Sequence, residues 1–186
     1  LVIGNAAYTN ASPLLNAAND ATDITAALQR SGFTVVTGTD MTQEAMDQAL
    51  LDFRTLAHGA DAAAFYYAGH GVQLSGENYL LPINADLTHQ SQVQYRSLPL
   101  GTVMGVLQES GASFKLVILD ACRDNPFAAM RSLQTGLSSP SMAPTGALIA
   151  YATAPGQRAS DNPTGRNGLF TSALLEEMET PGLEVS

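Results

Sequence analysis

The chain has 186 residues, of which 45% are hydrophobic and 13% are charged. This composition excludes an intrinsically disordered chain, and the length is typical of a single domain. With 8 basic and 17 acidic residues the net charge is −9, which argues against nucleic acids and anionic membrane surfaces as partners.

Short apolar runs along the chain predict five strands of a buried sheet. The third and fourth runs are apolar on both faces, as buried parallel strands are. The five runs are Leu1–Asn5, Phe33–Val36, Ala62–Ala68, Leu116–Asp120 and Ala147–Thr153. A further short strand is predicted at Tyr79–Leu81, inside the polar stretch Ser75–Ser97.

Helical patterns lie between these runs, with apolar residues recurring at three- and four-residue intervals. The predicted helices are Asp20–Ser31 with Gly32 as its C-cap, one with its N-cap at Thr42, Pro99–Ser110, and Leu169–Met178. Alternation of strands and helices predicts an α/β fold, in which a mostly parallel sheet has helices on both faces. Ligands of such sheets bind beyond the carboxyl ends of the strands.

The residues Gln134–Thr145 are rich in Ser, Pro, Thr and Gly and predict a flexible surface linker. The chain starts within an apolar run without an initiator Met, and it ends abruptly at Pro181–Ser186. We therefore expect residues 1–186 to be a single domain of a longer protein.

A histidine and the one cysteine follow two strands that can be neighbours. His70 follows the third apolar run, and Cys122 follows the fourth. A catalytic thiol needs a base to form its thiolate, and histidine commonly fills that role. Each residue alone is more often structural, but together they predict a thiol nucleophile and its base. Gly69 and Gly71 flank the histidine and would let the backbone turn sharply and approach a substrate closely.

Six segments, taken in order, resemble the caspase-like cysteine peptidases, in particular their bacterial metacaspase-like (orthocaspase) branch. A His-Gly pair followed about 50 residues later by an Ala-Cys-Arg turn is the central part of this resemblance. The segments are LVIGNAAY at the start, NAANDA at 16–21, YYAGHG at 66–71, NYLLPINAD at 78–86, ILDACRDNPF at 118–127 and GALIAYATAPG at 146–156.

The resemblance implies the caspase–haemoglobinase fold, a three-layer α/β/α sandwich, and hydrolysis of peptide bonds by a thiolate. In this sequence it makes Cys122 the nucleophile and His70 the general acid–base. The backbone N–H groups of Gly71 and Cys122 would form the oxyanion hole. The substrate backbone would pair in extended form with Ala152, Thr153 and Ala154.

Two acidic residues predict the substrate preference. Asp120 lies two residues before Cys122 and so on the same face of a strand, and Asp20 matches a second pocket acid of metacaspases. Two carboxylates in one pocket favour Arg or Lys and repel Asp. Two alternatives stay open: Asp20 as a helix N-terminal charge, and Asp120 as a buried structural acid that would need a partner such as Arg123.

The resemblance also implies a division into a large-subunit-like part (1–133), the linker (134–145) and a small-subunit-like part (146–186). Arg131, just before the linker, is the predicted self-cleavage site for an enzyme that cuts after basic residues. Arg158 and Arg166 are the secondary candidates.

The expected partners are proteins or peptides with a basic residue at the cleavage site, with neither nucleic acid nor membrane involved. No cofactor or metal is required by these residues. Calcium, on which many metacaspases depend, stays open, because no loop has EF-hand spacing and a solvated acidic surface is the simpler interpretation. The sequence leaves the oligomeric state undetermined, and the cytoplasm and periplasm of a bacterium are both open as locations.

Two other functions compete with an active peptidase. A catalytically silent caspase-like module would serve in interaction or regulation, although such modules usually lack the cysteine or the histidine. A small-molecule-binding α/β domain would need a phosphate-binding loop, and the sequence has neither GxGxxG nor GxxxxGK[ST].

Overall fold

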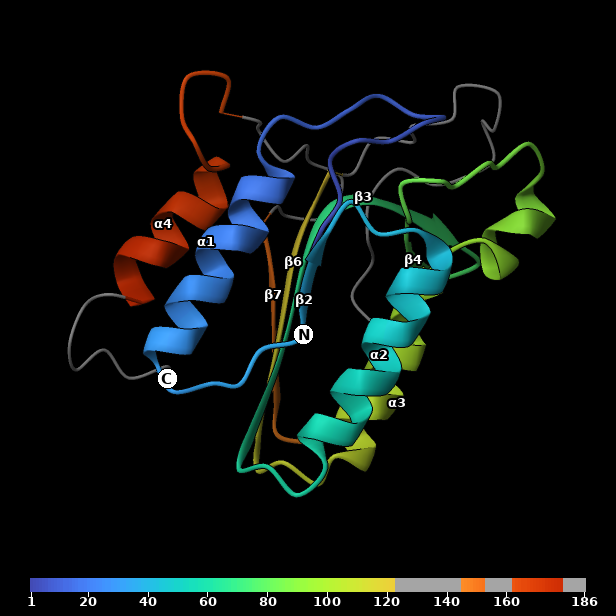
Figure 1. Cartoon of the computed structure of the whole chain (residues 1–186). Helices are drawn as coiled ribbons and strands as arrows, with labels where there is room; N and C mark the ends of the chain where they lie inside the picture. The colour runs from blue at the N-terminus through green and yellow to red at the C-terminus, as the bar shows by residue number, and fades with distance from the viewer. Residues whose placement is uncertain (123–144, 153–161, 179–186) are drawn as a thin grey trace.

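The computed structural model describes residues 1–122, 145–152 and 162–178. In these ranges one mixed sheet runs through the middle of the molecule (Figure 1). Five strands are parallel in the order β2–β1–β3–β6–β7, and β4 and β5 extend the sheet antiparallel from the second half of β3. The strands are β1 (Val2–Gly4), β2 (Thr37–Thr39), β3 (Ala62–Leu74), β4 (Glu77–Leu80), β5 (Leu98–Pro99), β6 (Phe114–Cys122) and β7 (Ala147–Tyr151).

Helices cover both faces of this sheet (Figure 1). One face packs against α1 (Ala17–Arg30) and α4 (Leu169–Met178), and the other against α2 (Gln43–Ala57) and α3 (Leu100–Glu109). A 3-10 helix, η1 (Gln90–Tyr95), lies in the polar stretch before β5. The predicted three-layer α/β/α sandwich with a mostly parallel sheet is confirmed.

The central strand β3 supplies both hydrophobic layers. Phe65 and Tyr67 belong to the core beside α2 and α3, whereas Tyr66 and Ala68 belong to the core beside α1 and α4. All four side chains are at most 1% exposed. Burial on both faces explains why this strand is a continuous apolar run in the sequence.

The predicted second strand, Phe33–Val36, is wrong by several residues. The strand that pairs with β1 is Thr37–Thr39, and Val2 lies opposite Thr37. Phe33 and Val35 instead pack against the core beside α1. The apolar run marks side chains that fill the core, whereas the ladder itself is formed by the polar Thr-Gly-Thr segment that follows.

The helices lie close to their predicted positions. Helix α1 starts at Ala17, three residues before the predicted start, and its C-cap is Ser31, with Gly32 following at φ +87°. The side-chain oxygen of Thr42 accepts a hydrogen bond from the Ala45 N–H and so caps α2 as predicted. The bounds of α4 are those predicted, and α3 is one residue shorter at each end.

Strand β3 continues through His70 to Leu74, so the backbone does not make the sharp turn that the flanking glycines would allow. Neither Gly69 nor Gly71 has a positive φ. Gly69 is needed for space, because a Cβ there would lie 2.5 Å from the Tyr67 hydroxyl oxygen and 2.7 Å from that of Tyr8.

The predicted linker lies outside the described residues except for Thr145. The carbonyl of Thr145 accepts a hydrogen bond from the buried ammonium group of Lys115 at 3.0 Å, which ties the start of β7 to β6. No helix in the described ranges is long and apolar enough to cross a membrane.

Candidate active site

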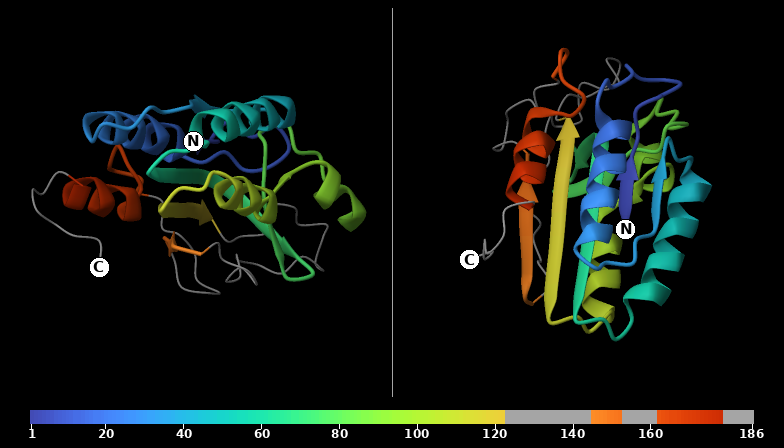
Figure 2. Two further views of the ribbon diagram at one scale, coloured as in Figure 1. Left: turned by 90° about the horizontal axis from the view of Figure 1, so that it is seen from below. Right: turned by 60° about the vertical axis from the view of Figure 1, so that its left-hand side comes forward.

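The structure brings His70 and Cys122 together. They are directly opposite each other in the parallel ladder of β3 and β6, as the last pair of that ladder. Figure 2 shows β6 between β3 and β7, with its carboxyl end at the same edge of the sheet as the loops that follow β1. The two residues predicted to act together therefore meet at the edge where this fold class binds ligands.

The imidazole of His70 is buried and oriented by a backbone carbonyl. Its Nε2 lies 2.8 Å from the Ser12 oxygen. A carbonyl oxygen can only accept a hydrogen bond, so Nε2 is the nitrogen that carries the proton. In the neutral ring Nδ1 is then the basic nitrogen.

Tyr8 holds His70 from a second side. The two rings pack with centroids 4.5 Å apart at 51°, and the His70 N–H donates to the Tyr8 hydroxyl at 2.8 Å. The segment that carries Tyr8 and Ser12 is anchored where the N–H groups of Ala6 and Ala7 donate to Asp40 Oδ1, at 2.8 Å each. Sequence reasoning did not single out Tyr8 or Ser12. Ser12 contacts His70 through its backbone carbonyl, and no residue type marks such a contact in a sequence.

The backbone of Gly71 faces the carboxyl end of β6. The carbonyl of the preceding His70 accepts from Leu81 N–H at 3.0 Å, so it faces β4 and not β6. Backbone groups alternate in direction along a strand, so those of Gly71 face the opposite side, where Cys122 ends β6. The oxyanion hole expected from the N–H groups of Gly71 and Cys122 stays a prediction.

The two acidic residues predicted to share a pocket are adjacent. The Gly168 N–H donates to Asp20 Oδ1 at 3.0 Å. A Cβ on Gly168 would lie 3.3 Å from Asp20 Oδ2 and 3.6 Å from Asp120 Oδ2. Both carboxylates therefore lie beside Gly168, the residue just before α4, on the side where a side chain would project.

Asp20 is only 3% exposed, which makes its ionised form costly. Burial raises its pKa from 3.8 to about 6. Hydrogen bonds from Gly168 N–H and the Asn167 side chain oppose that rise, and the charges of Asp120 and Asp23 add to it. Asp20 lies in the first turn of α1, where the alternative of a helix N-terminal charge placed it, and its carboxylate also accepts the Gly168 N–H.

Asp120 is held by a hydroxyl group. Its Oδ2 accepts a hydrogen bond from Thr171 Oγ1 at 2.7 Å, and the Tyr66 hydroxyl lies 2.6 Å from the same Oγ1. Arg123, the partner that a structural acid was expected to need, lies outside the described residues. Sequence reasoning missed Thr171 and Tyr66 because both stand in apolar segments that look like ordinary core.

The segment before α4 is fastened to the polar side of α1. Arg166 forms a bidentate ion pair with Asp23, at 2.8 and 3.0 Å. The hydrogen bond from Arg166 is the main reason why the pKa of Asp23 is lowered. The Asn16 side chain donates to the carbonyls of Gly165 and Arg166. This anchoring sets the position of Gly168 over the two carboxylates.

The family model for the caspase domain matches residues 1–186. The chain belongs to the caspase-domain family. This caspase domain is 28% identical over 123 residues to the mucosa-associated lymphoid tissue lymphoma translocation protein 1 of Homo sapiens, covering 66% of this chain and 15% of that protein. It is 29% identical over 153 residues to a protein of a Desulfuromonadales bacterium described as a "probable protease", covering 77% of this chain and 18% of that protein.

The mouse homologue of the human relative matches in the same way, at 28% over 123 residues, covering 66% of this chain and 14% of the relative. This caspase domain thus spans less than a fifth of the length of these three relatives. The resemblance to caspase-like peptidases is confirmed, and the domain is of the cysteine-peptidase type. The bacterial metacaspase-like branch and the roles of single residues stay predictions.

Several predicted site residues of the caspase domain can be placed only in part. Ala152 follows β7, and its N–H donates to the Leu119 carbonyl at 3.0 Å, so it continues the pairing with β6. Thr153 and Ala154 lie outside the described residues, as do the predicted cleavage sites Arg131 and Arg158. In the described ranges no three His, Cys, Asp or Glu side chains gather so as to hold a metal ion.

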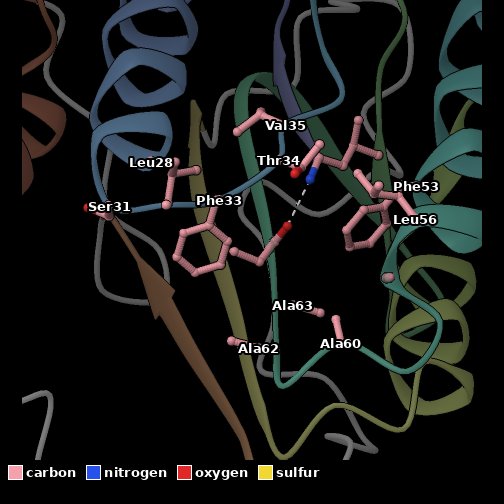
Figure 3. Close-up of a pocket in the computed structure, with 14 residues that line it drawn as sticks. Leu28, Ser31, Phe33, Thr34, Val35, Phe53, Leu56, Ala60, Ala62 and Ala63 are labelled. Atoms are coloured by element: carbon pink, nitrogen blue, oxygen red, sulfur yellow. Dashed lines mark hydrogen bonds between the residues drawn. The ribbon is translucent and has the colours of Figure 1, made fainter.

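A cavity of about 310 Å³ lies at the other end of the sheet (Figure 3). Its walls are mainly apolar and come from the end of α1, the end of α2 and the start of β3. Phe33, Phe53 and Ala62 are among the residues that line it. It contains none of the predicted site residues.

Proposed function

We propose that this caspase domain is a cysteine endopeptidase that cleaves peptide bonds after Arg or Lys. The observation that carries the proposal is the pairing of His70 with Cys122 as the last pair of the parallel ladder between β3 and β6. Partner residues in a parallel pair present their side chains to the same face of the sheet. A cysteine and a histidine on paired positions of neighbouring strands are candidates for a nucleophile and its base.

The tautomer of His70 supports its role as the base. Its Nε2–H donates to the Ser12 carbonyl, so Nδ1 takes the proton of the Cys122 thiol. The thiolate attacks the scissile carbonyl, and the oxyanion is stabilised by the N–H groups of Gly71 and Cys122. The imidazolium then protonates the leaving amine, and the thioester remains on Cys122. Water, deprotonated by the same nitrogen, hydrolyses the thioester and restores the thiol.

The adjacent carboxylates of Asp20 and Asp120 support the preference for basic residues. A guanidinium group between them would form charge-assisted hydrogen bonds, and an aspartate side chain would be repelled. Arg is favoured over Lys, because its planar fork can meet two carboxylate oxygens at once. The preference is a separate proposal from the Cys–His chemistry, and the experiment distinguishes the two.

The test uses fluorogenic peptides that end in Arg, Lys, citrulline or Asp, with and without calcium. Wild type is expected to hydrolyse the Arg peptide fastest, and citrulline, which is isosteric with Arg but uncharged, is expected to be poor. Cys122→Ala and His70→Ala should each lower kcat by at least about a thousandfold. His89→Ala, at an exposed histidine away from the sheet edge, is the matched control and should leave kcat unchanged.

Faster hydrolysis of the Asp peptide would overturn the basic preference but keep the dyad. Equal hydrolysis by wild type and Cys122→Ala would overturn the peptidase mechanism. Failure of every peptide, with correct folding by circular dichroism, would favour the silent interaction module instead.

A further inference from the structure

Two buried hydroxyl groups, those of Tyr66 and Thr171, form a hydrogen-bonded chain that ends on the Asp120 carboxylate. Tyr66 comes from β3, Thr171 from the first turn of α4 and Asp120 from β6. Thr171 is fully buried and Tyr66 is 1% exposed. The Tyr66 and Thr171 oxygens are 2.6 Å apart, and Thr171 Oγ1 lies 2.7 Å from Asp120 Oδ2.

The number of hydroxyl protons determines which group donates and which accepts in each of these hydrogen bonds. Thr171 has one hydroxyl proton, and it donates that proton to Asp120. The Tyr66 hydroxyl must then be the donor to Thr171 Oγ1. Each donor therefore polarises the next, and the chain ends on a carboxylate oxygen that accepts. Burial, with the nearby Asp120 charge, raises the pKa of Tyr66 well above its usual value, so it remains a donor at every pH of interest.

The same stretch of chain also approaches Asp20. Gly168, three residues before Thr171, donates its N–H to Asp20, and no Cβ stands between it and the two carboxylates. The start of α4 therefore fixes one carboxylate through a backbone N–H and the other through a side-chain hydroxyl. These two contacts hold the carboxylates beside each other.

We propose that Thr171, itself held by Tyr66, is a positioning residue that determines selectivity for a cationic side chain by fixing the Asp120 carboxylate. This inference rests on the proposed function, because it assigns Asp120 to the substrate pocket. The Thr171 hydroxyl forms its hydrogen bonds with Tyr66 and Asp120. This hydroxyl is therefore expected to affect recognition and not the chemical step.

The experiment compares Thr171→Val, Thr171→Ser and Tyr66→Phe with wild type. Val has the shape of Thr without the hydroxyl, Ser keeps the hydroxyl without the methyl group, and Phe removes only the hydroxyl at the far end of the chain. For each variant kcat and KM are measured with the Arg and citrulline peptides. The rate of Cys122 alkylation by iodoacetamide reports the nucleophile independently of any pocket.

Thr171→Val should lower the ratio of kcat/KM for Arg to that for citrulline by roughly tenfold or more, through a raised KM for Arg. Tyr66→Phe should lower the same ratio about threefold, because it weakens a donor one bond further away. Thr171→Ser should restore the ratio to within about threefold of wild type. The alkylation rate should be unchanged in all three.

An unchanged Arg-to-citrulline ratio in both Thr171→Val and Tyr66→Phe would overturn the inference and leave the proposed function standing. So would a ratio in Thr171→Ser as low as in Thr171→Val, since packing would then be the cause. If Thr171→Val does not fold, Tyr66→Phe and Thr171→Ser still decide the question. A wild type that does not prefer Arg to citrulline would overturn the basic preference, and the inference with it.

Discussion

Asp20 meets two opposing demands. It is almost fully buried beside another carboxylate, which disfavours its charge, yet recognition of a cation requires that charge. Its pKa of about 6 lies within the range where enzymes are commonly studied. The protonation of this single side chain therefore links stability to pH and, on the proposed function, substrate preference as well.

Asp20→Asn is expected to raise Tm at pH 7.5 by several degrees and to lose this advantage at acidic pH. Below the unfolded pKa of 3.8 Asp20 is protonated in both states, and burial of the charge costs nothing. Between 3.8 and about 6 the folded protein keeps a proton that the unfolded chain releases, and above about 6 the full cost applies. Thermal unfolding at pH 4, 5.5 and 7.5 measures the difference.

The control for this prediction is Asp86→Asn, at an exposed position, which should change Tm little at any pH. The selectivity for Arg over citrulline peptides should fall below about pH 6 in wild type and be lower and pH-independent in Asp20→Asn. A Tm difference that is the same at pH 4 and pH 7.5 would contradict the assignment of the raised pKa to Asp20.

Single residues were predictable where an apolar run of the sequence ends. His70 and Cys122 each follow such a run, and the parallel pairing of the two runs places these residues opposite each other. Thr171 and Tyr66 were not predictable, because they meet across 105 residues of sequence and each resembles core. Ser12 acts through its backbone, which every residue has.

Strand β3 has a packing constraint at Gly69 that its sequence pattern does not indicate. Tyr8 and Tyr67 place their hydroxyl groups against Gly69, one residue before the histidine. The strand therefore has no room for a side chain at that position. A glycine in α3, by contrast, has open space beside it: apart from its chain neighbours and the nearby backbone of its own helix, no atom lies within 4 Å of where a Cβ on Gly105 would be.

Gly69→Ala is expected to lower the free energy of unfolding by roughly 1–3 kcal/mol, the usual cost of overpacking. It should also lower kcat. The added methyl group would displace the Tyr8 hydroxyl, which accepts the hydrogen bond from the His70 N–H. Gly105→Ala is the matched control and should stabilise the protein by about 0.5–1 kcal/mol, since alanine is the better helix former. Urea unfolding of the two variants measures both changes. Similar effects of the two substitutions would show that Gly69 is not crowded.

Elements were predictable in proportion to the regularity of their pattern. The predicted bounds of α4 agree with the structure, and Thr42 caps α2 as its hydroxyl led us to expect. The second strand was placed wrongly because its Thr-Gly-Thr ladder is polar and short. The full length of β3 was missed because glycine suggested a turn, whereas here it provides space for two tyrosine hydroxyl groups.

At the scale of the molecule, the parts on either side of the linker are joined by many contacts. Strand β7 pairs with β6 over five residue pairs, from Lys115 with Ala147 to Leu119 with Tyr151. Helix α4 packs against α1 in the same core. The Arg166–Asp23 ion pair and the Lys115–Thr145 hydrogen bond add to these. Cleavage of the chain within the predicted linker would therefore leave the two fragments associated.

Wild type is expected to cut itself after Arg131, and the two fragments should elute together in size-exclusion chromatography. They should separate only in denaturant, because the β6–β7 pairing and the α1–α4 packing cross the cut. Mass spectrometry locates the cut, and Cys122→Ala and Arg131→Ala are the controls that should remain whole. Cleavage of Cys122→Ala at the same rate as wild type would contradict self-processing.

The residues proposed for catalysis and the groups that position the two carboxylates come from different parts of the fold. This separation has a consequence for how caspase domains could acquire new substrate preferences. His70 lies within β3 and Cys122 ends β6, whereas the groups that hold the two carboxylates come from Gly168, just before α4, and from Thr171 in its first turn. On the proposed function, substitutions in residues 162–171 retune which side chain is accepted while the nucleophile and base stay as they are. A selection experiment randomising only that stretch would therefore be the shortest route to a domain of this kind with a new cleavage preference.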